Sequence, residues 1–96
     1  MAEIRFDWDP QKARSNEQKH GVSFEEAETA FYDEQALLLD DPEHSEKEER
    51  FTLLGLSASL RLLVVVHALR HQDVIRIISA RKATRLETRD YENRLR

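Results

Sequence analysis

The sequence contains no cysteine and very little glycine or proline. The absence of cysteine excludes disulfides, thiolate metal centres and cysteine nucleophiles. Two glycines and two prolines leave no glycine-rich phosphate loop and no flexible linker. The longest uninterrupted apolar run, Leu62–Val66, is far too short to span a membrane, and the N-terminal segment lacks the apolar core of a signal peptide. We therefore expect a cytoplasmic protein with no membrane partner.

The chain has the size and composition of one globular domain. Its 96 residues can bury a single core, and 40% apolar with 35% charged residues is a composition that folds. We expect one domain over residues 1–96.

Charge is distributed unevenly along the chain. Residues 1–49 carry 5 basic and 15 acidic side chains, whereas residues 50–96 carry 10 basic and 4 acidic ones. The basic half is consistent with a surface for nucleic acid or for an acidic partner. It is equally consistent with neutralisation by the acidic half within the fold. The net charge of −4 argues against tight non-specific binding to DNA.

Local patterns predict helices and strands in a clear order. Alternating Ile4, Phe6 and Trp8 predict a short strand. Asp9 and Pro10 are typical of a helix start, so residues 11–20 are expected to be helical and to end at Gly21. A second helix is expected to begin at Ser23, with Glu26 at the spacing of a capping box.

The rest of the chain predicts a short strand at 36–39 and a charged loop at 40–49. Three strands at 50–56, 61–69 and 74–79 are expected to form an antiparallel meander, followed by a basic helix at 82–95 that would pack through Ala83, Leu86, Tyr91 and Leu95. Together these elements predict an α+β fold of order β-α-α-β-β-β-β-α, with helices packed on an antiparallel sheet.

The last predicted strand carries the most informative polar residues. Alternation places Ile75, Ile77, Ser79 and Arg81 on one face, and Val74, Arg76 and Ile78 on the other. Arg76 would either pair with Asp7, Asp9 or a loop glutamate, or clamp a phosphate through its planar donors. Ser79–Lys82 would end the strand and open the basic helix, where a phosphate could meet helix N-terminal amides. That segment is equally compatible with an ordinary strand-to-helix turn.

Two histidines have alternative interpretations. His67 shares a strand face with Arg61, Leu63 and Val65, and is either a hydrogen-bonded structural residue or a proton shuttle. His20 ends the first helix, where the helix dipole favours its cation, and it is equally compatible with a plain C-terminal cap interaction.

Several blocks of sequence together resemble one family. Phe6–Ala27 reads F-D-W-D-P-x-K-A-x-x-N-x-x-K-H-G-V-S-F-E-E-A, and it is followed by the blocks Asp40–Phe51, Gly55–Ser57, Arg61–His67 and Arg76–Thr84. In this order and spacing they resemble BrnT-type toxins, the toxin halves of type II toxin–antitoxin modules. The resemblance covers nearly the whole chain.

The resemblance implies a RelE-like fold and a ribonuclease that halts translation. It implies neutralisation by a BrnA-type antitoxin in a hetero-oligomer, with operator DNA bound only through the antitoxin. RelE-like nucleases generally need no metal and no cofactor, so neither is expected here. Their reaction activates a ribose 2′-hydroxyl against the adjacent phosphate, which requires a base, an acid and cations.

The resemblance also transfers to individual positions. We predict Arg50 and Arg76 as phosphate-charge stabilisers, with His67 or Glu49 transferring protons. Contacts to RNA are predicted for Lys19, His20, Ser79, Arg81 and Lys82.

The alternative function is a partner protein with little or no catalysis, acting mainly as an antitoxin-bound co-repressor of its own operon. An independent DNA-binding regulator is disfavoured, because the chain is acidic and has no recognisable helix-turn-helix.

Overall fold

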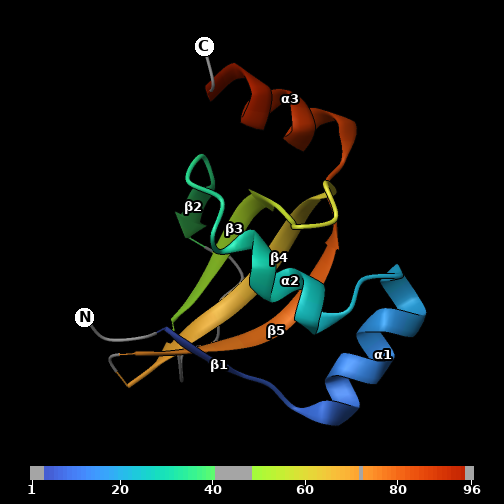
Figure 1. The fold of residues 1–96 in the computed structure, drawn as a ribbon, viewed down its shortest axis with the longest axis vertical. Coiled ribbons are helices and arrows are strands. Elements are labelled where there is room, and N and C mark those ends of the chain that lie inside the picture. Colours follow the sequence, from blue (N-terminus) through green and yellow to red (C-terminus); the bar gives the residue numbers. More distant parts are fainter. Residues whose placement is uncertain (1–3, 41–48, 72, 95–96) are drawn as a thin grey trace.

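The fold is described from a computed structural model, which defines residues 4–40, 49–71 and 73–94. The element order agrees with the predicted β-α-α-β-β-β-β-α (Figure 1), with the bounds β1 (Arg5–Asp7), α1 (Pro10–His20), α2 (Phe24–Ala30), β2 (Leu37–Asp40), β3 (Arg50–Leu56), β4 (Leu62–Arg70), β5 (Val74–Lys82) and α3 (Arg85–Arg94).

The five strands form one sheet in the order β1-β5-β4-β3-β2. Strands β2 to β5 pair antiparallel, as predicted. The edge strand β1 pairs with β5 in parallel, so the sheet is mixed. Alternating apolar residues in β1 identify a strand but carry no information about the direction of its partner, which is why the sequence did not predict this pairing.

The caps of α1 and α2 agree with the sequence signals. The Asp9 carboxylate accepts a hydrogen bond from the Gln11 amide at 2.8 Å, and Gly21 ends α1 in the left-handed region with φ 69°. The Ser23 hydroxyl accepts from the Glu26 amide at 3.0 Å at the start of α2. These local bonds satisfy helix-terminal groups that would otherwise lack partners.

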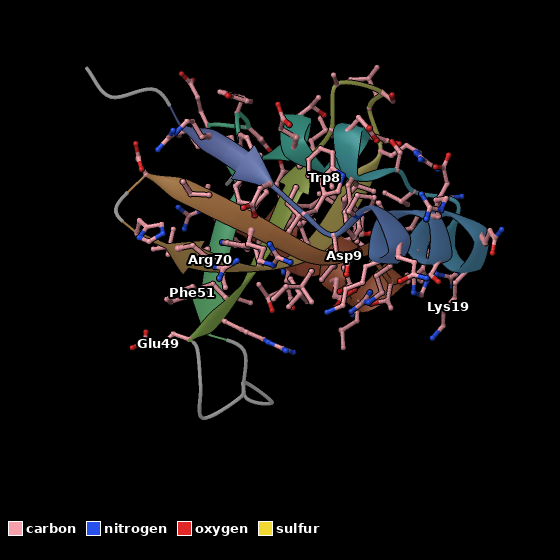
Figure 2. All side chains as sticks on the ribbon, turned by 90° about the horizontal axis from the view of Figure 1, so that it is seen from below. Trp8, Asp9, Lys19, Glu49, Phe51 and Arg70 are labelled. Carbon is pink, nitrogen blue, oxygen red and sulfur yellow. The ribbon has the colours of Figure 1, made fainter. Side chains whose placement is uncertain are left out.

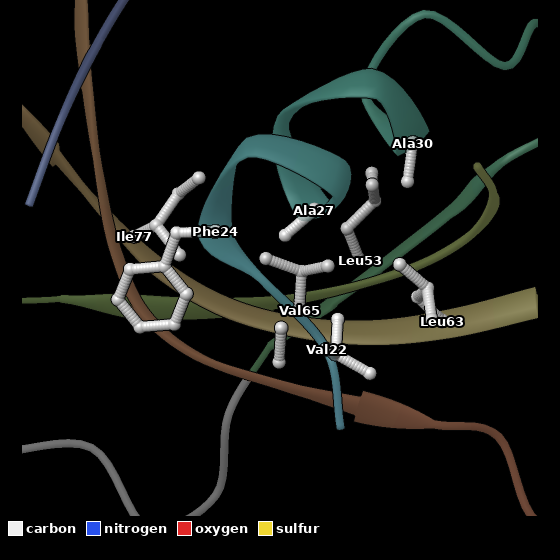
Figure 3. Packing of buried hydrophobic residues seen from close by; sticks show 9 residues of the cluster. Val22, Phe24, Ala27, Ala30, Leu53, Leu63, Val65 and Ile77 are labelled. Atoms are coloured by element: carbon white, nitrogen blue, oxygen red, sulfur yellow. The ribbon is translucent and has the colours of Figure 1, made fainter. Parts of the chain in front are cut away.

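Helix α2 covers one face of the sheet and encloses the core (Figure 3), while α1 lies against β5 and packs Ala13 against that core. The largest fully buried side chains there are Phe24, Leu63, Ile77, Val22 and Val65. Helix α2 approaches β3 closely at Gly55, where a Cβ would lie 2.8 Å from the Ala30 carbonyl oxygen. Glycine is therefore required at this position for steric reasons.

Helix α3 covers only one end of the opposite face, where Tyr91 packs against Leu54 and Val64. Two boundary predictions and one packing prediction are corrected. Strand β5 continues to Lys82, α3 begins at Arg85, and Leu86 is 65% exposed instead of packed. Thr84 explains the later start, because its hydroxyl accepts from the Glu87 amide while the Glu87 carboxylate accepts from the Thr84 amide.

The predicted charged loop begins later than expected, since Asp40 ends β2. Residues 41–48 of that loop and the predicted packing residue Leu95 lie outside the described residues. None of the described helices is long and apolar enough to span a membrane.

Candidate functional site

The sheet face opposite α1 and α2 presents polar side chains beyond the end that α3 covers. We call this surface the open face and define it by Arg50, Thr52, Val66, Ala68, Arg76 and Ser79, which the strand registers place on the same side. Ala68 pairs with Arg50 on β3 and with Arg76 on β5, so the two arginines flank one small residue. Two strand spacings separate them, which is roughly 10 Å.

A bulge in β5 decides which polar residues reach the open face. Val66 pairs with Ser79 and His67 pairs with Ile77, so Ile78 is an extra residue with no partner on β4. The predicted alternation is therefore wrong beyond Ile77. Ser79 and Arg81 share the face of Arg76, because the extra residue reverses the side of the sheet to which each later side chain points.

Arg76 is already held on one side by β1. Its Nη1 lies 3.4 Å from Oδ1 of Asp7, the partner that strand pairing places beside it. The two side chains are 29% and 48% exposed, and such partly exposed ion pairs contribute little stability. The contact orients the guanidinium and leaves its other donors available to an anion.

The Arg50 side chain carries a buried donor. Its Nε is buried and has no hydrogen-bond partner among the described residues. A buried donor without an acceptor is costly, and a phosphate oxygen at this point of the sheet would satisfy it.

Arg81 is engaged in holding α3. Its guanidinium donates to both carboxylate oxygens of Glu87 at 2.8 and 2.9 Å. These hydrogen bonds lower the pKa of Glu87 to about 2 and raise the pKa of Arg81 above its ordinary value. Lys82 lies on the other side of the sheet, opposite Leu63, and near enough to Glu26 to help lower the pKa of that carboxyl. These two predicted RNA contacts therefore lie apart from each other.

Lys19, His20 and Ser79 come together in a groove between α1 and β5. The α1–β5 groove has a volume of about 470 Å³ and is lined by Asp9, Gln11, Lys12, Ser15, Asn16, Lys19, His20, Ile78 and Ser79. The expected helix N-terminus is not part of it, because Ser79 lies within β5 and α3 begins six residues later. Figure 2 shows Lys19 projecting from α1 on the side of the ribbon away from Trp8.

His67 lies within the helix-covered core. It is 3% exposed, its Nδ1 is 3.2 Å from the Val65 carbonyl oxygen, and its ring centroid is 4.8 Å from that of Phe31. Burial lowers the pKa of His67, so its neutral form is favoured. The structure does not bring His67 together with Arg50 and Arg76, which face the other way.

Glu49 directly precedes β3 and is exposed. Figure 2 shows it at the start of that strand, with its carboxylate directed away from the sheet. Among the described residues, no group of three or more His, Asp or Glu side chains is positioned to hold a metal ion.

Comparison with known proteins identifies the family. The family model described as "Ribonuclease toxin, BrnT, of type II toxin-antitoxin system" matches residues 8–87. The chain belongs to the BrnT toxin family. It is also similar in fold to the crystal structure of the Brucella abortus ribonuclease toxin BrnT, with a TM-score of 0.65 and 23% identity over 85% of this chain and 99% of that one. No curated protein sequence matches.

Most residues that line the groove of this BrnT-family chain were not among the predicted site residues, and two of them, Asn16 and Lys12, shape it most directly. The Asn16 side chain donates to the Val22 and Ala80 carbonyls and accepts from the Ala80 amide, which fixes α1 to the part of β5 beyond its pairing with β1. Lys12 lines the groove one turn earlier. The spacing of Lys12, Asn16 and Lys19 is i, i+4, i+7, which places all three on one helix face and is visible in the sequence.

The arrangement combines a sheet face that bears two arginines with an adjoining groove lined by two lysines. Arg50 and Arg76 supply planar, permanently charged donors, and Lys12, Lys19 and His20 extend this surface along α1. Such a surface can contact several phosphates of one extended polyanion.

Proposed function

We propose that this chain is a ribonuclease toxin that cleaves RNA on the open face, without a metal or cofactor. The observation that carries the proposal is the row Arg50–Ala68–Arg76, in which two arginines flank a small residue on a sheet face that α1 and α2 leave uncovered. Membership of the BrnT family supports the class of reaction.

In the proposed reaction the 2′-oxygen of one ribose attacks the adjacent phosphorus and the bond to the 5′-oxygen breaks. The products are a 2′,3′-cyclic phosphate and a 5′-hydroxyl, so no water is consumed in this step. Extra negative charge develops on the phosphoryl oxygens as the new bond forms. Arg50 and Arg76 would stabilise that charge by donating hydrogen bonds to these oxygens.

A base must take the 2′-hydroxyl proton, and an acid must protonate the leaving oxygen. Of the two predicted candidates, His67 would need the core to open, because it is 3% exposed beneath Phe31. Glu49 is exposed beside Arg50, so its rotation toward the sheet needs no repacking. We therefore assign the base to Glu49, leave His67 a structural role, and assign the proton that the leaving 5′-oxygen receives to solvent water on this exposed face.

We further propose that the chain acts in the cytoplasm as a single toxin domain in a module with a BrnA-type antitoxin. The antitoxin would neutralise the basic C-terminal surface and alone would contact operator DNA. The excess of basic over acidic residues in 50–96 supports an acidic or nucleic-acid partner for this half.

The experiment is RNA cleavage by the purified protein in EDTA. Wild type is expected to cleave, and Arg76→Ala or Arg50→Ala to lose about 100-fold or more in rate while remaining folded by circular dichroism. Arg89→Ala, which removes an exposed cation from α3, is the control and is expected to retain activity. Loss of activity in Arg89→Ala equal to that in Arg76→Ala would contradict a localised site.

The alternative is an inactive partner that acts only as an antitoxin-bound co-repressor. The net charge of −4 and the Asp7 contact to Arg76 favour this alternative, since both weaken attraction of RNA. It predicts no growth arrest when the chain is expressed alone, and no cleavage even when ribosomes are supplied.

A further inference from the structure

The α1–β5 groove adjoins the open face through Ser79. This residue lines the groove and also stands on the open face, one row beyond Arg76. A strand of RNA with a phosphate at Arg76 would therefore enter the groove without leaving the protein surface. The volume of about 470 Å³ lies in the range of small-ligand sites.

The lining of the groove contains groups suited to both parts of a nucleotide. Lys12 and Lys19 are separated by roughly 10 Å along the axis of α1, and both are exposed cations able to bind phosphate. Ile78, the extra residue of the β5 bulge, supplies an apolar surface on which a base can lie. Asp9 contributes a carboxylate that would repel a free phosphate but can accept from the amino group of a base.

Asn16 makes the groove rigid instead of serving as a ligand contact. It is 8% exposed, and both N–H groups of its side-chain amide are used, one on Val22 and one on Ala80. Its oxygen accepts from the Ala80 amide. The two walls of the groove are thus held together before any ligand binds, which reduces the entropy lost on binding.

We propose that the α1–β5 groove is a subsite for the flanking nucleotide, the one beyond the two joined by the scissile phosphate, with Lys12 and Lys19 on its backbone and Ile78 against its base. This inference rests on the proposed ribonuclease function, and it adds a subsite that determines how long an RNA must be to bind well. In this proposal Lys12, Lys19 and Ile78 bind RNA, and the chemical step takes place on the open face.

The test compares two uncleavable probes, a fluorescent 2′-O-methyl hexanucleotide and the corresponding dinucleotide, by anisotropy. Lys12→Ala/Lys19→Ala is expected to raise the Kd of the hexanucleotide about 10-fold or more and to leave the dinucleotide unchanged. For this variant, the slope of log K against log salt for the hexanucleotide should become shallower by about 1.4. Each phosphate contact to a single strand contributes about 0.7 to that slope, and the variant loses two such contacts. The control Arg14→Ala/Arg89→Ala removes two exposed cations outside the groove and should change neither probe by more than about 2-fold.

A separate measurement tests the contact between Ile78 and the base. An abasic residue at the flanking position should weaken hexanucleotide binding to wild type and have no further effect on Ile78→Ala. If the groove and control double variants weaken binding equally, the surface acts only through diffuse charge and the subsite is refuted. If the groove variant binds and cleaves as wild type while Arg76→Ala is inactive, the subsite is refuted and the ribonuclease stands. A wild type that neither binds nor cleaves RNA refutes both.

Discussion

On the helix-covered face Leu53 of β3 and Ile77 of β5 are buried beneath α2, whereas on the open face the same two strands present Arg50 and Arg76. The neighbouring positions of one strand thus belong to a packed core and to a charged surface. Titratable groups differ in the same way, since His67 lies in the core while the arginines stay in contact with solvent. The lesson is that strand alternation, read with the position of bulges, separates residues that hold the fold from residues that can meet a substrate.

The strongest test of this comparison replaces an apolar side chain on each face. Phe24 is fully buried among the core residues, so Phe24→Ala is expected to lower the free energy of unfolding by about 3–5 kcal/mol. Leu39 is exposed on the open side of β2, so Leu39→Ala should change the free energy of unfolding by no more than about 0.5 kcal/mol. Urea unfolding measures both. Equal losses would mean that the two faces are not differently packed.

A second test concerns the junction of α1 with β5. Asn16→Ala leaves the Ala80 amide and carbonyl without partners and should cost about 2–4 kcal/mol in the free energy of unfolding. Ser15→Ala, on the same helix but exposed, is the control and should change little. If Asn16→Ala proves as stable as the control, water replaces the amide and the groove is not preorganised by this residue.

A third test adds one carbon to the helix-covered face. The new Cβ of Gly55→Ala would lie 2.8 Å from the Ala30 carbonyl oxygen, and backbone at this distance has to move. We expect a loss of about 1–3 kcal/mol in the free energy of unfolding. Thermal unfolding followed by circular dichroism measures it, and an unchanged midpoint would show that α2 shifts freely on the sheet.

The smallest expected effect concerns the anchor of α3. Arg81 lowers the pKa of Glu87 from 4.5 to about 2, so the pair contributes stability above pH 4.5 that is lost as the pH falls toward 2. Because both side chains are partly exposed, solvent reduces this contribution to about 1 kcal/mol. At pH 7 the free energy of unfolding of Glu87→Gln should be lower than that of wild type by this amount. Near pH 2 the two proteins should be equally stable. Glu92→Gln, on the exposed side of α3, should follow wild type throughout.

The sequence predicted those features of the fold that depend on local signals. Asp9, Gly21 and Ser23 fixed the ends of the two N-terminal helices, and alternation identified the strands. The start of α3 was misplaced although Thr84 and Glu87 have capping-box spacing, because the basic run Arg81–Lys82 was interpreted as the start of a helix. The parallel pairing of β1 depends on contacts distant in the chain, which no local pattern contains.

The candidate site was predicted in its composition more than in its geometry. Alternation correctly placed His67 with Leu63 and Val65, and that placement already implied burial beneath a helix-covered face. The bulge at Ile78 left no signal in the sequence, so Ser79 and Arg81 were assigned to the wrong face. The groove was missed as a unit because its walls, α1 and β5, are brought together only by the tertiary fold.

The most direct test of the central claim compares one residue from each face in a single assay. RNA cleavage in EDTA would be measured for wild type, Arg76→Ala and His67→Leu, each normalised to its folded fraction. We expect Arg76→Ala to lose activity and His67→Leu to retain it, because Arg76 would meet the substrate whereas His67 packs beneath Phe31. Full activity in Arg76→Ala together with its loss in folded His67→Leu would contradict the account and place the reaction on the other side of the sheet.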